Sequence, residues 1–500
     1  MEQIIDTHFW NPHLKLSKPM EYTYTSIGQN FKLRTPVLTK KSVEEIIADL
    51  KKQRERYFLN SDIPTILDTI NTVTERWLDP MYKGRLLAKD ILPPITGFSS
   101  EMIETWGFGR FLSILKRENF PIFNKLNHEN FQDFSAHGAG WVKAYGTQEI
   151  THSNLDPVLI GHICAGNIIG IGAIEIIMDK LIDAATWVKP PSEEPVFTAL
   201  YAKTIEEIDP QLAYTIAVLP YKSKNTELNE FLFSQSDLIR ATGSEIARRN
   251  LMELSKNHNT PVAGHWHKLS FITIAREYLD KQAREIAELV SLDVSAWDQQ
   301  GCFSPHEVFV EKGGMASPKK FAKLLAEEMA VTAKILPKGS KSGKMQVLDG
   351  YHRYFKKKQM GEPVDIFQSP SKDWLVIYDG ISKDFEPSPL FRVIRVRPVD
   401  DIIDVVNIIR PLSKFLQTSG VAIPNNRILP FASAIGEVGV TNIRAISSMT
   451  LQKAWEPWDG RFPMQELFEH DNIRWVSIST RDIDEEIKTL LEQKRSLIDR

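Results

Sequence analysis

The chain is poor in cysteine, carries no excess of either charge and has no long uninterrupted apolar run. Its two cysteines, Cys164 and Cys302, are too few for a disulfide framework or a cysteine-rich zinc site, and they predict a reducing, cytoplasmic compartment. The 61 Lys and Arg residues nearly balance the 64 Asp and Glu residues, and a net charge of −3 argues against a nucleic-acid partner. Charged residues interrupt the most apolar stretch, residues 160–188, so we expect no membrane span.

What remains is the composition of an ordinary globular protein. The chain is 42% hydrophobic and 25% charged over 500 residues. At roughly 100–200 residues per domain, this length predicts two to four domains. The first residues, MEQIIDTHFW, lack the basic and then apolar segments of a signal peptide.

Hydrophobic periodicity predicts helices in the first part of the chain. Apolar residues at three- and four-residue spacing indicate helices over residues 43–58, 63–77 and 102–116. Residues 130–158 are turn-rich, with short β-like pieces. We therefore expect a helical beginning followed by an irregular segment.

Two blocks of alternating strands and helices follow. Within residues 159–254 this alternation predicts a parallel sheet with crossover helices, the usual frame for a dinucleotide. The strands expected there are 159–165, 185–189, 212–219 and 238–242. The second block covers about residues 269–446 and contains an irregular, lysine-rich insertion at 337–373, and a charged helix over 481–500 ends the chain.

The loop between the helix and the strand of the second block carries the first candidate for chemistry. Cys302 follows Gly301 and precedes Ser304-Pro305. A thiol in such a loop can be exposed, and exposure near a helix terminus can lower its pKa and make it a nucleophile. The alternative is a small buried hydrophobic residue, which is how we interpret Cys164.

Three other candidates follow strands of the first block. The Asn167 amide could stabilise an oxyanion or simply cap the next helix. Lys189 ends a strand where nucleotides sit in open α/β sheets, although it could equally be a solvated lysine in a proline-rich turn. Thr242-Gly243-Ser244 joins a strand to a helix whose backbone N–H groups could hold phosphate.

A metal site is the weakest of the possibilities. His265 and His267 would share a face if their segment is extended, and His306 could join them. No carboxylate or cysteine lies at the spacing that metal ligands use. We therefore expect no metal.

The order and spacing of these residues resemble the aldehyde dehydrogenase superfamily. Closer still, the chain resembles the long-chain acyl-CoA reductase family, the LuxC-type fatty acid reductases of bacterial bioluminescence. The stretches that carry this resemblance are CAGNIIG (164–170), ATGSEIARR (241–249), LDVSAWDQQGCFSPHEVFVE (292–311), LQTSGV (416–421) and WDGRFPMQELF (458–468). The resemblance implies an aldehyde dehydrogenase-like α/β fold with a Rossmann-type cofactor domain, an α/β catalytic domain and a β oligomerisation arm.

The same resemblance implies the domain boundaries. A helical part packs on the cofactor domain, the arm follows, and a C-terminal segment returns after the catalytic domain. The implied ranges, in that order along the chain, are 1–130 for the helical part, 131–158 for the arm, 159–265 for the NAD(P)-binding domain, 266–435 for the catalytic domain and 436–500 for the return segment. The arm implies a homo-oligomer.

The family's chemistry is thioester reduction. It implies that Cys302 attacks an acyl thioester, with Asn167 and the Cys302 backbone N–H stabilising the oxyanion. Coenzyme A then leaves, and hydride from a nicotinamide cofactor releases a fatty aldehyde. The acyl donor implied is acyl-CoA, or an acylated carrier or synthetase protein.

One departure from the superfamily concerns water. Hydrolytic aldehyde dehydrogenases carry a glutamate in a Glu-Leu-Gly-Gly-Lys motif that activates water. Here the matching stretch is Gly264-His-Trp-His-Lys268, without a carboxylate. We expect the acyl-enzyme to resist hydrolysis, and we interpret His265 and His267 as structural residues in preference to proton donors.

The other departures concern the cofactor. NAD-preferring relatives place a glutamate three residues after the strand lysine, where this chain has Ser192, so we expect NADPH to be accepted. A shift by one or two residues would place Glu193 or Glu194 there and favour NADH. Glu386 matches the superfamily's nicotinamide-ribose glutamate, although the Phe-Gly that follows that glutamate is missing.

Three other functions stay open. The first is a short-chain, CoA-acylating aldehyde dehydrogenase. The second is a cysteine acyltransferase or thioesterase that forms the acyl-enzyme without hydride transfer. The third is a scaffold without catalytic activity, which the presence of both Asn167 and Cys302 disfavours.

Overall fold

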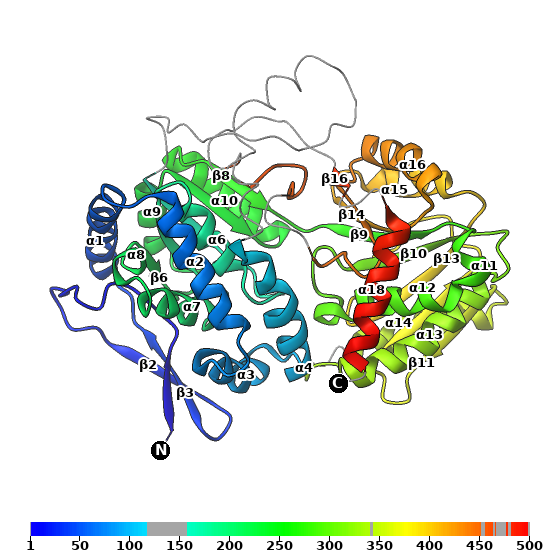
Figure 1. The fold of residues 1–500 in the computed structure, drawn as a ribbon, viewed down its shortest axis with the longest axis horizontal. Helices are drawn as coiled ribbons and strands as arrows, with labels where there is room; N and C mark the ends of the chain where they lie inside the picture. The colour runs from blue at the N-terminus through cyan, green and yellow to red at the C-terminus, as the bar shows by residue number, and fades with distance from the viewer. Residues whose placement is uncertain are drawn as a thin grey trace, which may run out of the picture.

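The computed structural model has two lobes, each built around its own sheet (Figure 1). It describes residues 2–117, 158–340, 344–451, 456–463, 466, 477–478 and 482–498. The N-terminal lobe comprises residues 2–117 and 158–265, and the C-terminal lobe comprises residues 269–451 and 482–498. The segment expected to form the oligomerisation arm, apart from its last residue, lies outside the described residues.

The chain begins with a small sheet that the periodicity did not predict. Strand β3 (Phe31–Pro36) lies between β1 (Gln3–Asp6), which is parallel to it, and β2 (Tyr22–Ile27), which is antiparallel. Most residues of β2 are exposed, so the strand lacks the apolar alternation that reveals a half-buried strand. The N-terminal part is therefore not purely helical.

Helices follow where they were predicted, with one difference. Helices α1 (Lys40–Phe58) and α2 (Ile63–Leu78) confirm the first two predictions, and α3 (Lys83–Thr96) comes next. The third prediction, 102–116, is instead a short α4 (Ser100–Met102), a π-helix over Ile103–Phe111 and a 3₁₀ turn over Leu112–Leu115. Gly107 and Gly109 interrupt this segment, and glycine is a poor former of regular α-helix.

The parallel sheet predicted for residues 159–254 is confirmed. Its five strands are all parallel in the order β6-β5-β4-β7-β8. They are β4 (Leu159–Ile163), β5 (Ala185–Lys189), β6 (Ile216–Val218), β7 (Leu238–Thr242) and β8 (Val262–His265). The connecting helices are α6 (Ile171–Lys180), α7 (Phe197–Glu206), α8 (Pro210–Ala213), α9 (Thr226–Gln235) and α10 (Glu245–His258). Because β5 and β7 lie on opposite sides of β4, the strand order reverses at β4, and ligands bind at such a point.

One predicted strand in this lobe was too long. The segment 212–219 forms the end of α8 and only then the short strand β6. Pro210 begins α8, and the Asp209 carboxylate caps it by accepting hydrogen bonds from two backbone N–H groups. Apolar residues in so short a stretch do not distinguish a helical turn from a strand.

The C-terminal lobe has an eight-stranded sheet in which only β11 is antiparallel to its neighbour. Its order is β11-β12-β13-β10-β9-β14-β15-β16. The strands are β9 (Leu269–Ile274), β10 (Pro305–Glu311), β11 (Val364–Gln368), β12 (Leu375–Asp379), β13 (Val393–Val399), β14 (Leu416–Ala422), β15 (Asn442–Ala445) and β16 (Ser477–Ile478). Strands β11 and β14 were not predicted.

Helices cover this sheet. They are α11 (Tyr278–Lys281), α12 (Ala283–Ser295), α13 (Pro318–Ile335), α14 (Lys344–Gln359), α15 (Val405–Ile409), α16 (Asn425–Glu437) and α18 (Ile483–Ile498). The insertion at 337–373 contains α14, which covers the part (347–358) where a helix was expected, and β11, in a part that was expected to be irregular. Among the described residues, no helix is both long and apolar enough to cross a membrane.

Candidate functional site

Cys302 lies in the tight connection from α12 to β10, at the boundary between the lobes. The Ser270 hydroxyl of β9 donates to the Cys302 carbonyl at 2.9 Å and fixes the loop on the sheet. A Cβ on Gly301 would lie 2.5 Å from the Phe303 ring, so only glycine fits there. Phe303 itself packs into the core of the N-terminal lobe, and the cysteine is therefore held by both lobes.

The backbone that leads to Cys302 is strained. Trp297, Asp298 and Gln299 have φ of 53°, 50° and 64°, a left-handed conformation that costs about 1–2 kcal/mol for each residue with a side chain. The Trp297 ring is buried against Phe98 of the N-terminal lobe, with ring centroids 5.4 Å apart. Such strain persists only where surrounding contacts impose it, and it is concentrated at functional sites.

Contacts from the C-terminal lobe hold the other two strained residues. Asp298 accepts from Arg392 Nε at 2.8 Å, and both side chains are fully buried. The Gln299 side chain makes two hydrogen bonds to the Val393 backbone, each of 2.9 Å. The cysteine loop is therefore rigid before any substrate arrives.

Asn167 faces this loop from the N-terminal lobe. It lies in the bend after β4, where the strand order reverses, and its Nδ2 donates to the Gln300 carbonyl at 3.0 Å. The residue at the cap of α6 is Gly170, with φ of 94° and no side-chain hydrogen bond. The helix-cap interpretation of Asn167 is therefore wrong, and the structure brings the amide to the segment that carries Cys302.

Three residues that were not proposed as reactive groups form a chain of hydrogen bonds that begins at the sulfur. Gln417 of β14 places its Nε2 3.6 Å from Cys302 Sγ and donates to Asp459 Oδ1 at 2.6 Å. Asp459 Oδ2 accepts from His265 Nδ1 at 2.8 Å. His265 had been interpreted as structural. Gln417 and Asp459 fell within stretches that carried the resemblance, but no local pattern singled them out.

A tight turn positions Asp459. Trp458 and Arg461 pair through two backbone hydrogen bonds, and Asp459 and Gly460 between them have φ of 49° and 84°. Asp-Gly is a favoured pair for a two-residue hairpin turn with both central φ positive. The turn brings the Asp459 carboxylate against β8 and β14 together.

Negative and positive side chains alternate from Asp459 through His265 to Glu466. Burial raises the pKa of the Cys302 thiol, the negative charge of Asp459 raises it further, and the result is about 11. Burial lowers the pKa of His265, but Glu466 and Asp459 outweigh burial and raise it to about 10. Burial raises the pKa of Asp459, but the hydrogen bond from His265 and the charge of Lys268 bring it down to about 2. The free thiol is thus protonated at neutral pH, and the expectation of a lowered thiol pKa is wrong.

The predicted cofactor residues line the same edge of the first sheet. Thr242 Oγ1 accepts from Ala165 N at 2.8 Å, and Gly243 N donates to the His265 carbonyl at 3.1 Å. Ser244 caps α10 and is exposed. Lys189 ends β5, is buried, and lies 5.5 Å from the centre of the Tyr221 ring. Burial lowers the pKa of Lys189.

The carboxylates after Lys189 have different roles. Glu194 is buried, and its Oε1 accepts from the first backbone N–H groups of α7 at 2.8 and 2.7 Å. It is therefore not free to bind a ribose. Ser192 and Glu193 are exposed, and the negative charge of Glu193 acts on Lys189.

Comparison with known families shows to which family the chain belongs. The family model for acyl-CoA reductase (LuxC) matches residues 59–470. The chain belongs to the acyl-CoA reductase (LuxC) family. No curated protein matches the sequence.

Solved structures similar to this chain include aldehyde dehydrogenases. Salicylaldehyde dehydrogenase from Pseudomonas putida G7, complexed with salicylaldehyde, is 12% identical with a TM-score of 0.65, covering 97% of this chain and 96% of that one. An aldehyde dehydrogenase of Mycobacterium tuberculosis complexed with NAD⁺ is 14% identical with a TM-score of 0.62, covering 92% and 93%. These likenesses confirm the expected aldehyde dehydrogenase-like fold.

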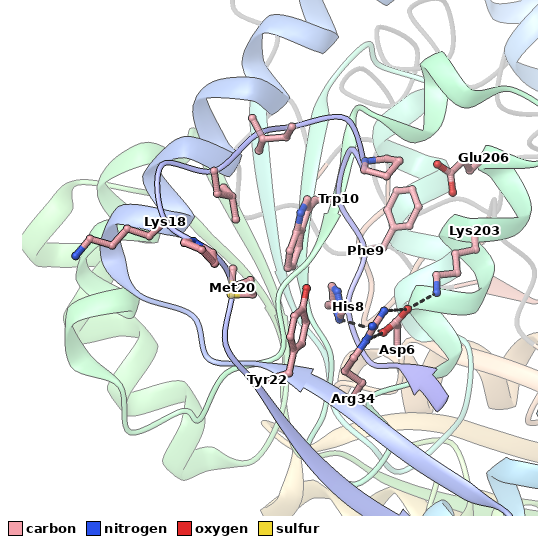
Figure 2. Close-up of a pocket in the computed structure, with 14 residues that line it drawn as sticks. Asp6, His8, Phe9, Trp10, Lys18, Met20, Tyr22, Arg34, Lys203 and Glu206 are labelled. Carbon is pink, nitrogen blue, oxygen red and sulfur yellow. Dashed lines mark hydrogen bonds and ion pairs between the residues drawn. The ribbon is translucent and has the colours of Figure 1, made fainter. Parts of the chain in front are cut away.

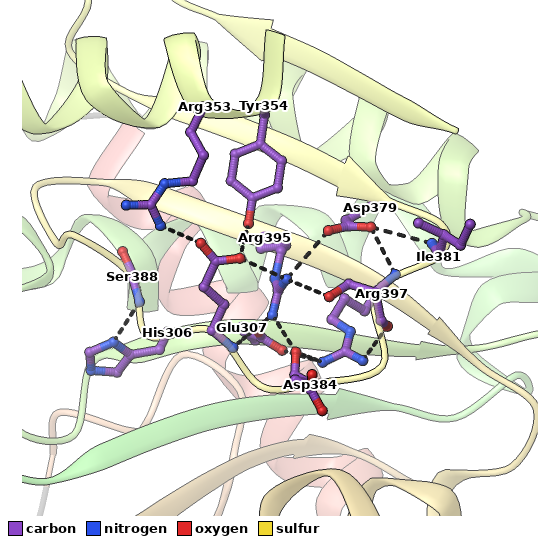
Figure 3. Close-up of polar contacts among 12 residues, drawn as sticks. His306, Glu307, Arg353, Tyr354, Asp379, Ile381, Asp384, Ser388, Arg395 and Arg397 are labelled. Carbon is purple, nitrogen blue, oxygen red and sulfur yellow. Dashed lines mark hydrogen bonds and ion pairs between the residues drawn. The ribbon is translucent and has the colours of Figure 1, made fainter. Parts of the chain in front are cut away.

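In this acyl-CoA reductase, Glu386 already has protein partners. Its Oε2 accepts from Tyr354 at 2.8 Å and from Arg395 at 3.2 Å, and its other oxygen pairs with Arg353. Figure 3 shows Arg353 and Tyr354 reaching from α14 toward Arg395 on the sheet. The described contacts of the Glu386 carboxylate are with residues of α14 and β13, whereas Asn167 contacts Gln300 in the loop that carries Cys302.

The acyl-CoA reductase also has a cavity far along the chain from Cys302. It measures about 430 Å³ and lies between the N-terminal segment and α7 (Figure 2). Three of its charged residues pair with each other, since Asp6 accepts hydrogen bonds from Arg34 and from Lys203. Among the described residues, no group of three or more His, Cys, Asp or Glu side chains could hold a metal ion.

Proposed function

We propose that the protein reduces long-chain acyl thioesters to fatty aldehydes with NADPH, through an acyl-enzyme on Cys302. The observation that carries this proposal is the meeting of Asn167 with the cysteine loop, where Nδ2 lies 3.0 Å from the Gln300 carbonyl. A nucleophile and an amide donor at the crevice of a dinucleotide-type sheet are the parts that acyl transfer followed by reduction requires. Membership of the acyl-CoA reductase family supports the same reaction class.

The first step forms the acyl-enzyme. The Cys302 sulfur attacks the thioester carbonyl, the C–S bond to coenzyme A breaks, and the thiol proton leaves with coenzyme A, which departs as its own thiol. Asn167 donates one hydrogen of Nδ2 to Gln300, which leaves its second hydrogen for the oxyanion. Gln417 at 3.6 Å from Sγ orients the sulfur and favours its charged form by donating a hydrogen bond.

Reduction follows because hydrolysis is slow. The Asp459 carboxylate is near the sulfur, but with a pKa of about 2 and its oxygens held by Gln417 and His265 it is too weak a base to activate water. The acyl-enzyme therefore persists until it is reduced. The cofactor, when bound, supplies the hydride.

The residues after β5 fit the adenosine end of that cofactor. Lys189 lies at the carboxyl end of the strand beside β4, where open α/β sheets bind nucleotides. Ser192 leaves room for the 2′-phosphate of NADPH. The exposed carboxylate of Glu193 repels that phosphate and limits the preference for NADPH over NADH. We take NADPH as the preferred donor, with NADH as a weaker one.

A direct assay tests the proposed function. NADPH oxidation is followed with acyl-CoAs of graded chain length, and acylation is followed with radiolabelled acyl-CoA without cofactor. We expect label on wild type and none on Cys302→Ser, which also loses reduction. Cys164→Ser is the matched control, because Cys164 is buried in the core beside β4; it should keep both activities.

Two results would contradict the proposal. Label that survives in Cys302→Ser and disappears in Cys164→Ser would show that Cys164, and not Cys302, is the nucleophile. Release of free acid without NADPH oxidation would indicate a thioesterase or acyltransferase. A preference for short acyl chains would favour the short-chain, CoA-acylating alternative.

We also propose that the enzyme is at least a dimer, from the place of residues 131–158 in the family pattern. Light scattering at micromolar concentration measures this. A monomer mass would contradict it.

A further inference from the structure

We propose that His265 supplies, through Asp459, the proton that returns to the Cys302 sulfur in each turnover, and that solvent then replaces the proton on His265. This inference rests on the proposed function and names how its reductive step is completed. It concerns residues that the sequence interpretation had assigned to structure or had not considered.

Geometry is the first support. One nitrogen, Gln417 Nε2, contacts both Cys302 Sγ at 3.6 Å and Asp459 Oδ1 at 2.6 Å. The distance between Cys302 Sγ and Asp459 Oδ1 therefore cannot exceed the sum of these two contact distances. One water molecule can bridge a distance of that size. On the far side, Asp459 Oδ2 meets His265 Nδ1 at 2.8 Å.

The second support is that a carboxylate holds each nitrogen of the His265 ring. His265 Nε2 lies 3.1 Å from Glu466 Oε2, so both ring nitrogens donate to carboxylates and the ring is an imidazolium. Glu466 is in turn held by Arg240 at 3.3 Å. The ring has one fixed orientation, with a proton aimed at Asp459.

Among the described residues, charged groups from several elements surround the relay, and they include Arg461, whose charge lowers the pKa of Glu466. From β7 comes Arg240, which also pairs with Glu175 of α6; the 458–461 turn supplies Asp459, and Glu466 follows it. Lys268, between β8 and β9, lies 4.0 Å from Asp459. The side chains of His265, Asp459 and Glu466 are 13%, 10% and 3% exposed, so their interactions are weakly screened.

Cys302 and His265, the two ends of the relay, have similar pKa values. The pKa of the thiol is about 11 and that of His265 about 10. A proton therefore moves from the imidazolium to the thiolate with little bias, which is the condition for efficient transfer. His265 is charged at neutral pH and is ready to donate.

The step balances as follows. Hydride from NADPH adds to the carbonyl carbon of acyl-Cys302, and the oxyanion then collapses with cleavage of the C–S bond. The aldehyde leaves and the electron pair stays on Sγ. The proton moves from His265 Nδ1 along Asp459 and a bridging water to the thiolate in one concerted transfer, so that Asp459 is never left protonated, and His265 then regains a proton from solvent. Acyl thioester, NADPH and one proton thus give aldehyde, NADP⁺ and thiol.

The test separates the two half-reactions. The variants are His265→Gln and the nearly isosteric Asp459→Asn, with His258→Gln as control because His258 pairs with Glu230 well away from the site. Acylation by radiolabelled acyl-CoA and kcat for NADPH oxidation are measured across pH, together with KM and Tm.

We expect KM near wild type in both variants. Acylation should be near wild type in His265→Gln and at least as fast as wild type in Asp459→Asn, where the thiol is more acidic. In both variants kcat should fall by about 10²–10⁴, the usual contribution of acid–base catalysis. Wild-type kcat should fall as pH rises through about 10, where His265 loses its proton, and His265→Gln should lack this fall. His258→Gln should match wild type.

Two outcomes overturn the relay. One is wild-type kcat with wild-type pH dependence in either variant. The other is loss of acylation by the same factor as kcat, which would make these residues supports of the site only. If wild type itself is not acylated at Cys302, the proposed function fails, and that is seen before any variant is compared.

Discussion

Replacing Asp459 by Asn should make the Cys302 thiol more acidic and therefore more reactive. The Asp459 charge opposes formation of the thiolate. Two unit charges about 5 Å apart at an effective dielectric near 20 interact by about 3 kcal/mol. Lys268, 4.0 Å from Asp459, and the imidazolium of His265 neutralise much of this. We expect the thiol pKa to fall by about one unit, which corresponds to about 1.4 kcal/mol.

The assay is alkylation by iodoacetamide as a function of pH, with the modified cysteine identified by mass spectrometry. Below the thiol pKa, Asp459→Asn should react about tenfold faster than wild type, because the thiolate fraction rises tenfold per unit. Glu466→Gln is the control, since Glu466 contacts His265 and not the sulfur. An unchanged or raised midpoint in Asp459→Asn would refute the electrostatic reasoning.

Four other changes have defined outcomes. Asn167→Ala should lower kcat by about 10²–10³ with little change in stability, because Asn167 does not cap α6; normal activity would exclude an oxyanion role. Ser192→Glu should shift kcat/KM about ten- to hundredfold from NADPH toward NADH, or about 1.4–2.8 kcal/mol, whereas Glu193→Gln should shift it the other way; a wild type that already prefers NADH would contradict both. Asp298→Asn leaves Arg392 buried without its charge partner and should lower the free energy of unfolding by about 3–5 kcal/mol, as measured in urea.

The parts of the fold that the sequence predicted are those with a simple physical signal. Strands β5 and β7 were predicted with the bounds that the structure has, because buried parallel strands are continuous apolar runs between helices. Strand β14 was missed for an informative reason. Its residues Gln417 and Thr418 are polar yet buried, and they break the apolar run where the strand passes the site.

The candidate site was predictable only in part. Cys302 and Asn167 were found through their spacing and loop context. The relay was not, because His265, Gln417 and Asp459 come from three distant segments that only the folded chain brings together. The Asp-Gly pair at 459–460 is typical of a hairpin turn. The sequence around it does not indicate which strands the turn contacts.

The left-handed backbone before Cys302 has a consequence for dissecting or recombining the molecule. Trp297 is held by the aromatic core of one lobe, and Asp298 is held by Arg392 of the other. Neither lobe alone contains what keeps these residues in place. The C-terminal lobe expressed by itself should relax this loop and lose the reactive position of the sulfur, although the cysteine and its own sheet are intact. A chimera that joins this lobe to a foreign cofactor domain would need to carry Phe98 and its aromatic neighbours along with it.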